Sequence, residues 1–149
     1  MKDNRVLLGF SGGIDSFAAV GLLQAAGYHV TALTLDMRGD SALLEKARLR
    51  AGTLGIPWRM RSVRERFERE VVDYFTDSYF RGRTPAPCTR CNSRIKWPCL
   101  AAEADALGIR HIATGHYFCI TSAGGKRYVT RAADNRKDQS YYPVSYTHL

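Results

Sequence analysis

The sequence predicts a single α/β domain built on a parallel sheet. Three observations lead to this expectation: apolar strand-like runs alternate with helical patterns, glycines stand where these elements end, and 45% of the 149 residues are apolar. A chain of this length and apolar content can bury a core of ordinary size. Alternating strands and helices are typical of a parallel sheet covered by helices.

The predicted elements begin in the order strand, helix, strand, helix, strand. A strand over residues 5–10 leads through a glycine turn into a helix over residues 17–26. A second strand over residues 30–35 precedes a helix over residues 41–54, and a short strand follows over residues 58–63. A glycine directly after each helix supports both helix ends.

A long amphipathic helix is expected over residues 64–80, where apolar residues recur at helical spacing between arginines and glutamates. Its aromatic residues share this spacing, which favours packing in the core over stacking on bases. They are Tyr74, Phe75, Tyr79 and Phe80.

The second half of the chain begins with a loop over residues 81–87, which holds one glycine and two prolines. A helix over residues 92–107 and a short strand over residues 111–114 follow. Two adjacent glycines then centre a hairpin that joins residues 117–121 to residues 127–131.

Basic residues outnumber acidic ones by 22 to 14, which gives a formal charge of +8 and an isoelectric point near 9.6. This balance favours an anionic partner such as nucleic acid, although a merely solvated positive surface is the alternative. No apolar stretch approaches the roughly 18 residues that span a bilayer, so we expect no membrane partner and a cytoplasmic location. The four cysteines are then expected to be catalytic, metal-binding or buried rather than paired in structural disulfides.

A glycine loop joins the first strand to the first helix, and a phosphate fits there because helix-terminal N–H groups point at it. Ser11 and Ser16 can add hydroxyl donors, and Asp15 can cap the helix or help hold a magnesium ion. A simple tight turn is the alternative. The loop has neither the lysine of a phosphate loop nor the spacing of a dinucleotide fingerprint. Its residues are Gly9, Phe10, Ser11, Gly12, Gly13, Ile14, Asp15 and Ser16.

The string SGGIDS over residues 11–16 resembles the pyrophosphate loop of the N-type ATP pyrophosphatases. The resemblance implies that ATP is cleaved between its α and β phosphates and that AMP passes to a substrate carbonyl. Thiolases, amidotransferases and ligases share this loop, so it indicates the first half-reaction and leaves the final product open. Magnesium is expected to accompany ATP.

Cys88 and Cys91 form a C-x-x-C unit that leads into a helix, where the helix terminus, Arg90 and Arg94 favour a thiolate. A reactive sulfur is therefore predicted. Two cysteines are only half of a structural zinc site, so zinc is the weaker alternative. An iron–sulfur cluster held by this pair and a further cysteine outside the chain stays open.

The remaining cysteines, Cys99 and Cys119, are expected to be buried. Positive charge around the cysteine loop is expected to contact RNA phosphates. The residues concerned are Arg81, Arg83, Arg90, Arg94 and Lys96. His116 is a weaker candidate, either for phosphate contact or for a structural hydrogen bond.

Residues 82–96 resemble the pattern GRTPNPxxxCNxxIK of tRNA-specific 2-thiouridylases of the MnmA/TrmU type. Residues 112–117 and 137–142 resemble that family's IATGHY and KDQSYF elements, in the same order. The resemblance implies a Rossmann-like, HUP-type adenine nucleotide alpha hydrolase domain over residues 1–142, truncated relative to the family. The family's central and C-terminal tRNA-binding domains are expected to be absent, and residues 143–149 form a tail of doubtful origin.

The resemblance also implies roles for single residues. Cys91 matches the catalytic cysteine, Gly9 to Ser16 match the ATP loop, and Leu35 and Gly115 match further nucleotide contacts. The loop near the target base matches Ala86, Pro87 and Cys88, where the family more often has Asn at 86 and Asp at 88. The tRNA-contacting segment matches Lys137, Asp138 and Gln139.

The implied activity is transfer of AMP to the wobble uridine of tRNA, followed by sulfur transfer to C2, which yields 2-thiouridine, AMP and pyrophosphate. In that scheme a downstream cysteine carries a persulfide, received from a sulfur-carrier or persulfide-donor protein, and Cys91 releases the product by forming a disulfide with it. Another pyrophosphatase-loop tRNA-modifying enzyme, or an inactive nucleotide- or tRNA-binding module, is the alternative.

Overall fold

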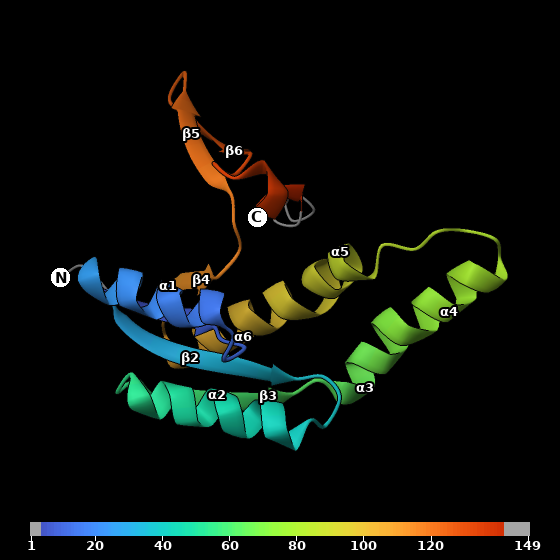
Figure 1. Cartoon of the computed structure of the whole chain (residues 1–149), viewed down its shortest axis with the longest axis horizontal. Coiled ribbons are helices and arrows are strands. Elements are labelled where there is room, and N and C mark those ends of the chain that lie inside the picture. Colours follow the sequence, from blue (N-terminus) through green and yellow to red (C-terminus); the bar gives the residue numbers. More distant parts are fainter. Residues whose placement is uncertain (1–3, 142–149) are drawn as a thin grey trace.

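A computed structural model describes residues 4–141 (Figure 1). Residues 1–3, the expected tail 143–149 and Tyr142, the last residue of the KDQSYF-like element, lie outside the described residues. The elements are β1 (Arg5–Gly9), α1 (Ile14–Ala25), β2 (His29–Asp36), α2 (Ser41–Thr53), β3 (Trp58–Ser62), α3 (Arg64–Phe67), η1 (Glu68–Val72), α4 (Asp73–Phe80), α5 (Pro87–Cys91), η2 (Asn92–Lys96), α6 (Trp97–Leu107), β4 (His111–Thr114), β5 (Cys119–Ala123), β6 (Lys126–Thr130) and η3 (Asn135–Lys137).

The main sheet has four parallel strands in the order β3-β2-β1-β4. Val6 of β1 pairs with Val30 on one side and with His111 on the other. β1 is therefore one of the two inner strands, and it is the one that joins the earlier strands to the later strand β4. The predicted α/β class is confirmed.

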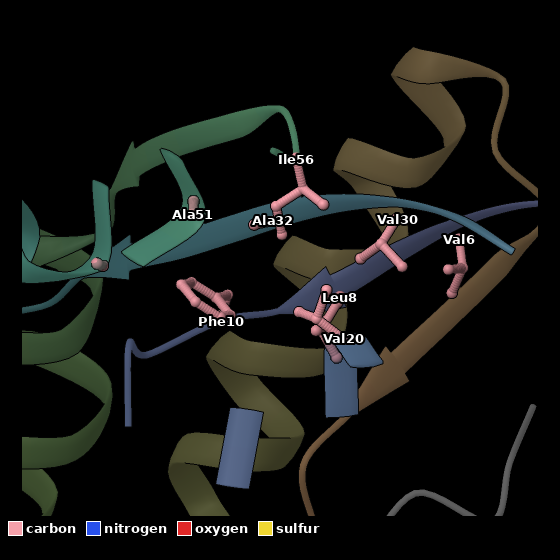
Figure 2. Close-up of a cluster of buried hydrophobic side chains, with 9 residues drawn as sticks. Val6, Leu8, Phe10, Val20, Val30, Ala32, Ala51 and Ile56 are labelled. Carbon is pink, nitrogen blue, oxygen red and sulfur yellow. The ribbon is translucent and has the colours of Figure 1, made fainter. Parts of the chain in front are cut away.

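Helices cover the two faces of this sheet. Val6 and Leu8 point to one face, where they pack in a cluster with residues of α1 and α2 (Figure 2). Leu7, the residue between them, packs on the other face against Leu100 and Ala104 of α6. Because neighbouring residues of a strand face opposite sides, an unbroken apolar run is what a strand covered on both faces needs.

A third cluster joins two helical segments beside the sheet. Val71 of η1 packs with Cys91, Ile95 and Cys99, all buried, from the helical stretch that begins at Pro87. Both segments contain a π-helical turn, η1 and η2, and the segments contact one another where η1 meets α5. This contact positions the C-x-x-C unit against the edge of the main domain.

The helix predicted over residues 64–80 is confirmed, but its aromatic residues are not in the core. Phe75, Tyr79 and Phe80 are exposed, with Phe80 87% accessible. The reason is visible in Figure 1, where α4 extends away from the sheet and only the first part of this helical segment lies against other elements. Helical spacing within one segment does not determine whether another element is present to bury its rings.

The second helical segment begins earlier than predicted, at Pro87 instead of residue 92. Proline is favoured in the first turn because its missing N–H is not needed there. Cys88 and Cys91 are therefore the second and fifth residues of α5 and do not lie in a loop. Likewise α1 begins at Ile14, so the glycine loop is shorter than expected.

The predicted hairpin is confirmed as β5 and β6, paired antiparallel and turned at Gly124 and Gly125. It stands away from the main sheet, with every residue of β5 exposed (Figure 1). Cys119 is consequently exposed, so its expected burial is wrong, whereas Cys99 is buried as expected. Within residues 4–141, none of the helices combines the length and apolar character needed to cross a bilayer.

Candidate nucleotide site and cysteine turn

The glycine loop passes close over α2. Gly12 has a φ of +69°, a left-handed conformation that favours glycine. A β-carbon on Gly12 would lie 2.9 Å from Cα of Ala47. The Arg50 guanidinium donates a hydrogen bond to the Gly12 carbonyl. Glycine is thus required here both by the backbone conformation and by contact with α2.

Two serines shape the start of α1. The Gly13 N–H donates to Ser11 Oγ at 3.2 Å, and Ser16 Oγ donates to the Gly13 carbonyl at 3.1 Å. The two hydroxyl oxygens are 3.4 Å apart. The first N–H groups of a helix have no carbonyl partner within the helix, so this turn offers donors and a positive dipole end to an anion.

Gly115, just beyond β4, lies directly on that helix start. A β-carbon at this position would be 3.2 Å from the Ser16 nitrogen and 3.3 Å from the Asp15 carbonyl carbon. The pairing of β1 with β4 therefore brings two predicted ATP-binding segments together that are about a hundred positions apart in sequence.

A pocket of about 600 Å³ opens at the carboxyl ends of β1, β2 and β4. This is the switch point of the sheet, because β2 and β4 lie on opposite sides of β1. Ligands of open α/β sheets usually bind at such a point. The predicted residues that line it are Gly9, Phe10, Ser11, Asp15, Ser16, Leu35, Gly115, His116, Lys96 and Gln139. Gly12, Gly13 and Ile14 do not line it, and the Ile14 side chain is 79% exposed.

Buried hydrogen bonds fix the loop against the sheet. Thr34 Oγ1 donates to the Phe10 carbonyl at 2.6 Å, and Trp58 Nε1 donates to Thr34 Oγ1 at 2.9 Å. Phe10 itself is fully buried between β1 and the helices above it. The glycine loop is thus attached to a rigid support.

Asp36 is a pocket residue that the sequence did not single out. Its buried carboxylate lies 2.6 Å from Arg64 Nη2 and accepts the Gly39 N–H at 2.7 Å. The hydrogen bond from Arg64 outweighs desolvation and holds the pKa of Asp36 below its usual value. An acidic residue at the end of an apolar strand, directly after Leu35, was the available signal.

His116 lines the pocket with Trp97, whose ring stacks on it at 6.4 Å between centroids. Its Nδ1 lies 2.9 Å from Thr114 Oγ1. Burial, aided by the nearby Lys96 charge, lowers the pKa of His116. A neutral imidazole at pH 7 follows, which suits a hydrogen-bonding contact better than a phosphate ion pair.

The predicted tRNA segment closes one side of the pocket. Gln139 donates its N–H to the Tyr117 carbonyl at 2.8 Å and accepts the Tyr117 N–H on its side-chain oxygen at 3.0 Å. Tyr117 donates its hydroxyl to Asp15 at 2.5 Å, and this hydrogen bond raises the pKa of Tyr117. Lys137 lies 5.6 Å above the Tyr117 ring. The segment is therefore tied to the glycine loop.

Asp138 has a local structural role in the same segment. Its carboxylate accepts the N–H of Ala132 at 2.7 Å and the hydroxyl of Ser140 at 2.8 Å. These hydrogen bonds lower the pKa of Asp138. The RNA contacts expected of Lys137, Asp138 and Gln139 stay a prediction.

Cys91 lies behind the pocket wall and not in it. It is 7% exposed, in the cluster formed with Val71, Ile95 and Cys99. Leu35 packs against that cluster and also lines the pocket, so it separates the two. Burial raises the pKa of the Cys91 thiol, although the Lys96 charge opposes this. The expectation that this position favours a thiolate at Cys91 is therefore wrong for the structure described.

Asn92, next to Cys91, was missed by sequence reasoning. It is 2% exposed, and its Oδ1 has no hydrogen-bond partner within the described residues. A buried amide oxygen without a partner is costly, and such groups mark sites where a ligand or water supplies the missing donor. The signal was present in the sequence, because a polar residue interrupts the apolar face of a helix.

The described residues differ in how well they fit the expected metals. They contain no group of three or more His, Cys, Asp or Glu side chains placed to share an ion. Magnesium needs only one or two carboxylates when phosphates supply other ligands, so Asp15 in the pocket fits it. Cys88 and Cys91 supply at most two of the thiolates that an iron–sulfur cluster needs, so the cluster with a further cysteine stays a prediction.

A second hollow, of about 480 Å³, lies between α4 and the cysteine turn, and we call it the arginine hollow. Arg90 stacks over Tyr74 at 4.3 Å and donates to the Glu70 carbonyl at 2.5 Å, so it forms a fixed wall. The hollow is lined by Arg69, Asp73, Tyr74, Asp77, Ser78, Arg81, Arg83 and Arg90. Three of the five arginines and lysines expected around the cysteine loop to contact RNA thus gather here, while Lys96 lines the nucleotide pocket.

Comparison with known proteins gives one family. The family described as the tRNA methyl transferase HUP domain matches residues 4–148. The tRNA-specific 2-thiouridylase MnmA 1 of Bacteroides fragilis (strain YCH46) is 46% identical over 144 residues, which are 95% of this chain and 40% of that protein. The corresponding protein MnmA of Clostridium acetobutylicum is 36% identical over 158 residues, 97% of this chain and 44% of that protein. The chain thus spans less than half the length of these curated relatives.

Two solved structures share the fold. A predicted subunit of tRNA methyltransferase from Methanocaldococcus jannaschii has a TM-score of 0.58 at 20% identity, over 76% of this chain and 53% of that one. NMN synthetase from Francisella tularensis has a TM-score of 0.51 at 23% identity, over 74% of this chain and 44% of that one. At these identities the likeness establishes the fold alone.

The predicted resemblance to 2-thiouridylases and the HUP-type fold are both confirmed by these matches. The family match covers nearly the whole chain, including the glycine loop, the cysteine turn and the segment that closes the pocket. The chain therefore belongs to the tRNA methyl transferase HUP domain family.

Proposed function

We propose that the chain is the ATP-binding, adenylating part of a tRNA 2-thiouridylase. The observation that carries the proposal is the convergence of the glycine loop and Gly115 on one pocket, one side-chain layer from Cys91. The names of the relatives, which are 36–46% identical, support uridine thiolation as the reaction. A longer protein with further tRNA-binding domains would carry out the complete reaction.

ATP would bind with its phosphates at the start of α1. The N–H groups of the first turn and the hydroxyls of Ser11 and Ser16 would bind the phosphates, and the adenine would lie near Leu35 at the end of β2. A magnesium ion, with Asp15 as its protein ligand, would neutralise phosphate charge. Lys96 and His116 also line the pocket, where a neutral His116 can hydrogen-bond to substrate.

Transfer of AMP to the uridine would make its C2 oxygen easier to replace. The C2 oxygen of uridine is a poor leaving group, whereas the same oxygen bonded to AMP leaves as a phosphate ester. The uridine would have to leave its base stack to reach the pocket, as in other base-modifying enzymes. A persulfide sulfur would then attack C2, and AMP would leave. Cys91 would attack the donor cysteine's sulfur, which frees the thiolated base and leaves a disulfide.

The tRNA is expected to cross the arginine hollow on its way to Cys91. Arg83 is exposed and Arg69 only loosely paired, so both are available to phosphate oxygens. By contrast Arg59 and Arg61 pair with Glu103, and Arg64 pairs with Asp36. The proposed partners are tRNA and a sulfur-carrier protein. The proposed location is the cytoplasm, where thiols stay reduced.

Pyrophosphate release tests the proposal. The chain incubated with ATP, magnesium and an unmodified tRNA transcript is expected to release pyrophosphate and form an AMP-linked RNA. Cys91→Ser in a full-length enzyme should keep this step and lose thiolation. An unchanged yield of thiouridine in that variant would remove Cys91 from the mechanism.

A second candidate function is an idle nucleotide- and tRNA-binding module. The buried Cys91 thiol, whose pKa is raised, favours it because a thiol reacts poorly in that state. ATP and tRNA binding without any tRNA-dependent pyrophosphate release would identify this function.

A further inference from the structure

The two thiols of the cysteine turn, Cys88–Cys91, differ in access. Cys88 is exposed, while Cys91 is buried against Val71 and Ile95. They are three residues apart in one helical turn, so their side chains leave the helix on the same side, with β-carbons about 5–6 Å apart. The reaction proposed above gives no task to Cys88.

We propose that Cys88 and Cys91 act as a dithiol pair in which Cys88 resolves the disulfide formed at Cys91. The source of that disulfide rests on the proposed function. The pairing itself rests on the spacing and on the exposed and buried positions of the two sulfur atoms. Cys88 is then a catalytic residue that regenerates Cys91 between reaction cycles, because it attacks one of the reacting sulfur atoms.

The step is a thiol–disulfide exchange. The Cys88 thiolate attacks the Cys91 sulfur of the disulfide between Cys91 and the donor cysteine. The bond between those two sulfurs breaks, the donor leaves as a thiolate and takes up a proton, and a Cys88–Cys91 disulfide forms. A dithiol reductant of the cell then supplies two electrons and two protons, which returns both thiols and oxidises the reductant to its own disulfide.

Burial explains why a second thiol is useful. A disulfide at a buried cysteine is hard for an external reductant to reach, since exchange requires direct attack on a sulfur atom. Cys88 is tethered next to Cys91 and so attacks it at a high effective concentration. Once the bond lies between the two residues, the exposed Cys88 sulfur is open to the external dithiol.

The local backbone can accommodate this bond. A disulfide needs β-carbons about 3.5–4.5 Å apart, so the turn must tighten by roughly 1–2 Å. In this turn the N–H groups of Cys88 and Thr89 precede the first helical hydrogen bond, and the Arg90 N–H donates to the Ala86 carbonyl at a long 3.3 Å, so the turn can adjust. Cys99 is no competitor, because eight residues of helix separate it from Cys91 by about 12 Å.

Oxidation by glutathione disulfide tests the pair on the 149-residue chain. Cys119→Ser serves as the parent, because it removes the other exposed thiol. Mass spectrometry is expected to show that the parent loses two hydrogens and carries no lasting glutathione. In the same background, Cys91→Ser is expected to retain glutathione on Cys88, with the adduct living at least about tenfold longer than in the parent. Cys99→Ala should behave like the parent.

A stable glutathione adduct on Cys88 in the parent, with Cys91 still a free thiol, would overturn the pair. So would a glutathione adduct on Cys88 that lives as long in the parent as in Cys91→Ser while circular dichroism shows both folded. The assay uses neither ATP nor tRNA, so it separates this inference from the proposed function. If Cys88 and Cys91 form the disulfide but the chain releases no pyrophosphate, the proposed function is wrong and the dithiol pair stands.

Discussion

At the scale of single residues, Gly115 and Gly12 are the positions where close approach of the chain leaves no room for a side chain. Gly115 lies against the first turn of α1, and Gly12 lies against α2. Both contacts involve backbone atoms, which cannot rotate away as a flexible side chain can. The shape of the glycine loop therefore depends on glycine at two places that are far apart in sequence.

Gly115→Ala is expected to weaken ATP binding by about tenfold, roughly 1.4 kcal/mol. The new methyl group would lie 3.2 Å from the Ser16 nitrogen and push the N–H donors out of place. Titration calorimetry with ATP measures the change. Gly21→Ala is the matched control, because it lies in α1 with nothing within 4 Å of its added carbon. An equal loss of affinity in both variants would contradict the role of Gly115.

Asp36→Asn is expected to lower the free energy of unfolding by about 1–2 kcal/mol at pH 7, since Gly39 and the half-exposed Arg64 side chain lose a charged, buried acceptor. The folded-state pKa of Asp36 lies below its ordinary value of 3.8. Its contribution is thus complete above pH 3.8 and disappears as the pH falls through the lowered folded value.

Urea unfolding at pH 7 and near pH 3 measures this difference between wild type and Asp36→Asn. The gap between the two proteins should shrink at the lower pH. Glu45→Gln breaks an exposed ion pair with Arg48 and should change little at either pH. A gap that stays constant with pH would mean that the Asp36 charge does not stabilise the fold.

At the scale of elements, the sequence predicted the sheet well and the outlying helices less well. Strands such as β1 are buried on both faces, so their apolar runs are explicit in the sequence. The position of α4 depends on which partner its apolar side meets, and spacing within one helix carries no such information. The same holds for Cys91, whose burial depends on Val71 and Ile95 from two different turns.

The candidate site was predictable where a motif is continuous and not where distant segments meet. The glycine loop is one short string, so its place between strand and helix followed from its neighbours. Asp36, Asn92 and the wall formed by Arg90 on Tyr74 arise from contacts between elements. Only the folded chain shows that Gln139 reaches the same pocket.

The double variant Arg69→Ala/Arg83→Ala is expected to weaken tRNA binding and to reduce the slope of log affinity against log salt by about 2, one for each phosphate that is no longer neutralised. Fluorescence anisotropy with labelled tRNA at several salt concentrations measures both quantities. Arg110→Ala is the control, since Arg110 precedes β4 at the opposite end of the sheet. An unchanged slope in the double variant would exclude the arginine hollow as an RNA-binding surface.

At the scale of the whole molecule, binding and completed chemistry are expected to separate. The 149 residues contain the nucleotide pocket, but no cysteine follows Cys119 in them. We expect ATP at a hundred times its Kd to stabilise the chain by about 2.7 kcal/mol, measured by denaturant unfolding with and without ATP. We also expect no thiouridine in digested tRNA after incubation with a persulfide donor. Thiouridine formed by these residues alone would contradict the need for a downstream cysteine.

The place of β1 between β2 and β4 also affects how the chain folds during synthesis. Residues leave the ribosome in order, so β1 can pair with β2 early, while its other edge waits for His111–Thr114. An open strand edge is a template for pairing with other chains. ATP cannot shorten this exposure, because Gly115 and Gln139 complete the pocket only after β4 has emerged. Until roughly the first hundred residues have been made, the nascent chain would therefore depend on chaperones or on rapid synthesis to avoid pairing with other chains.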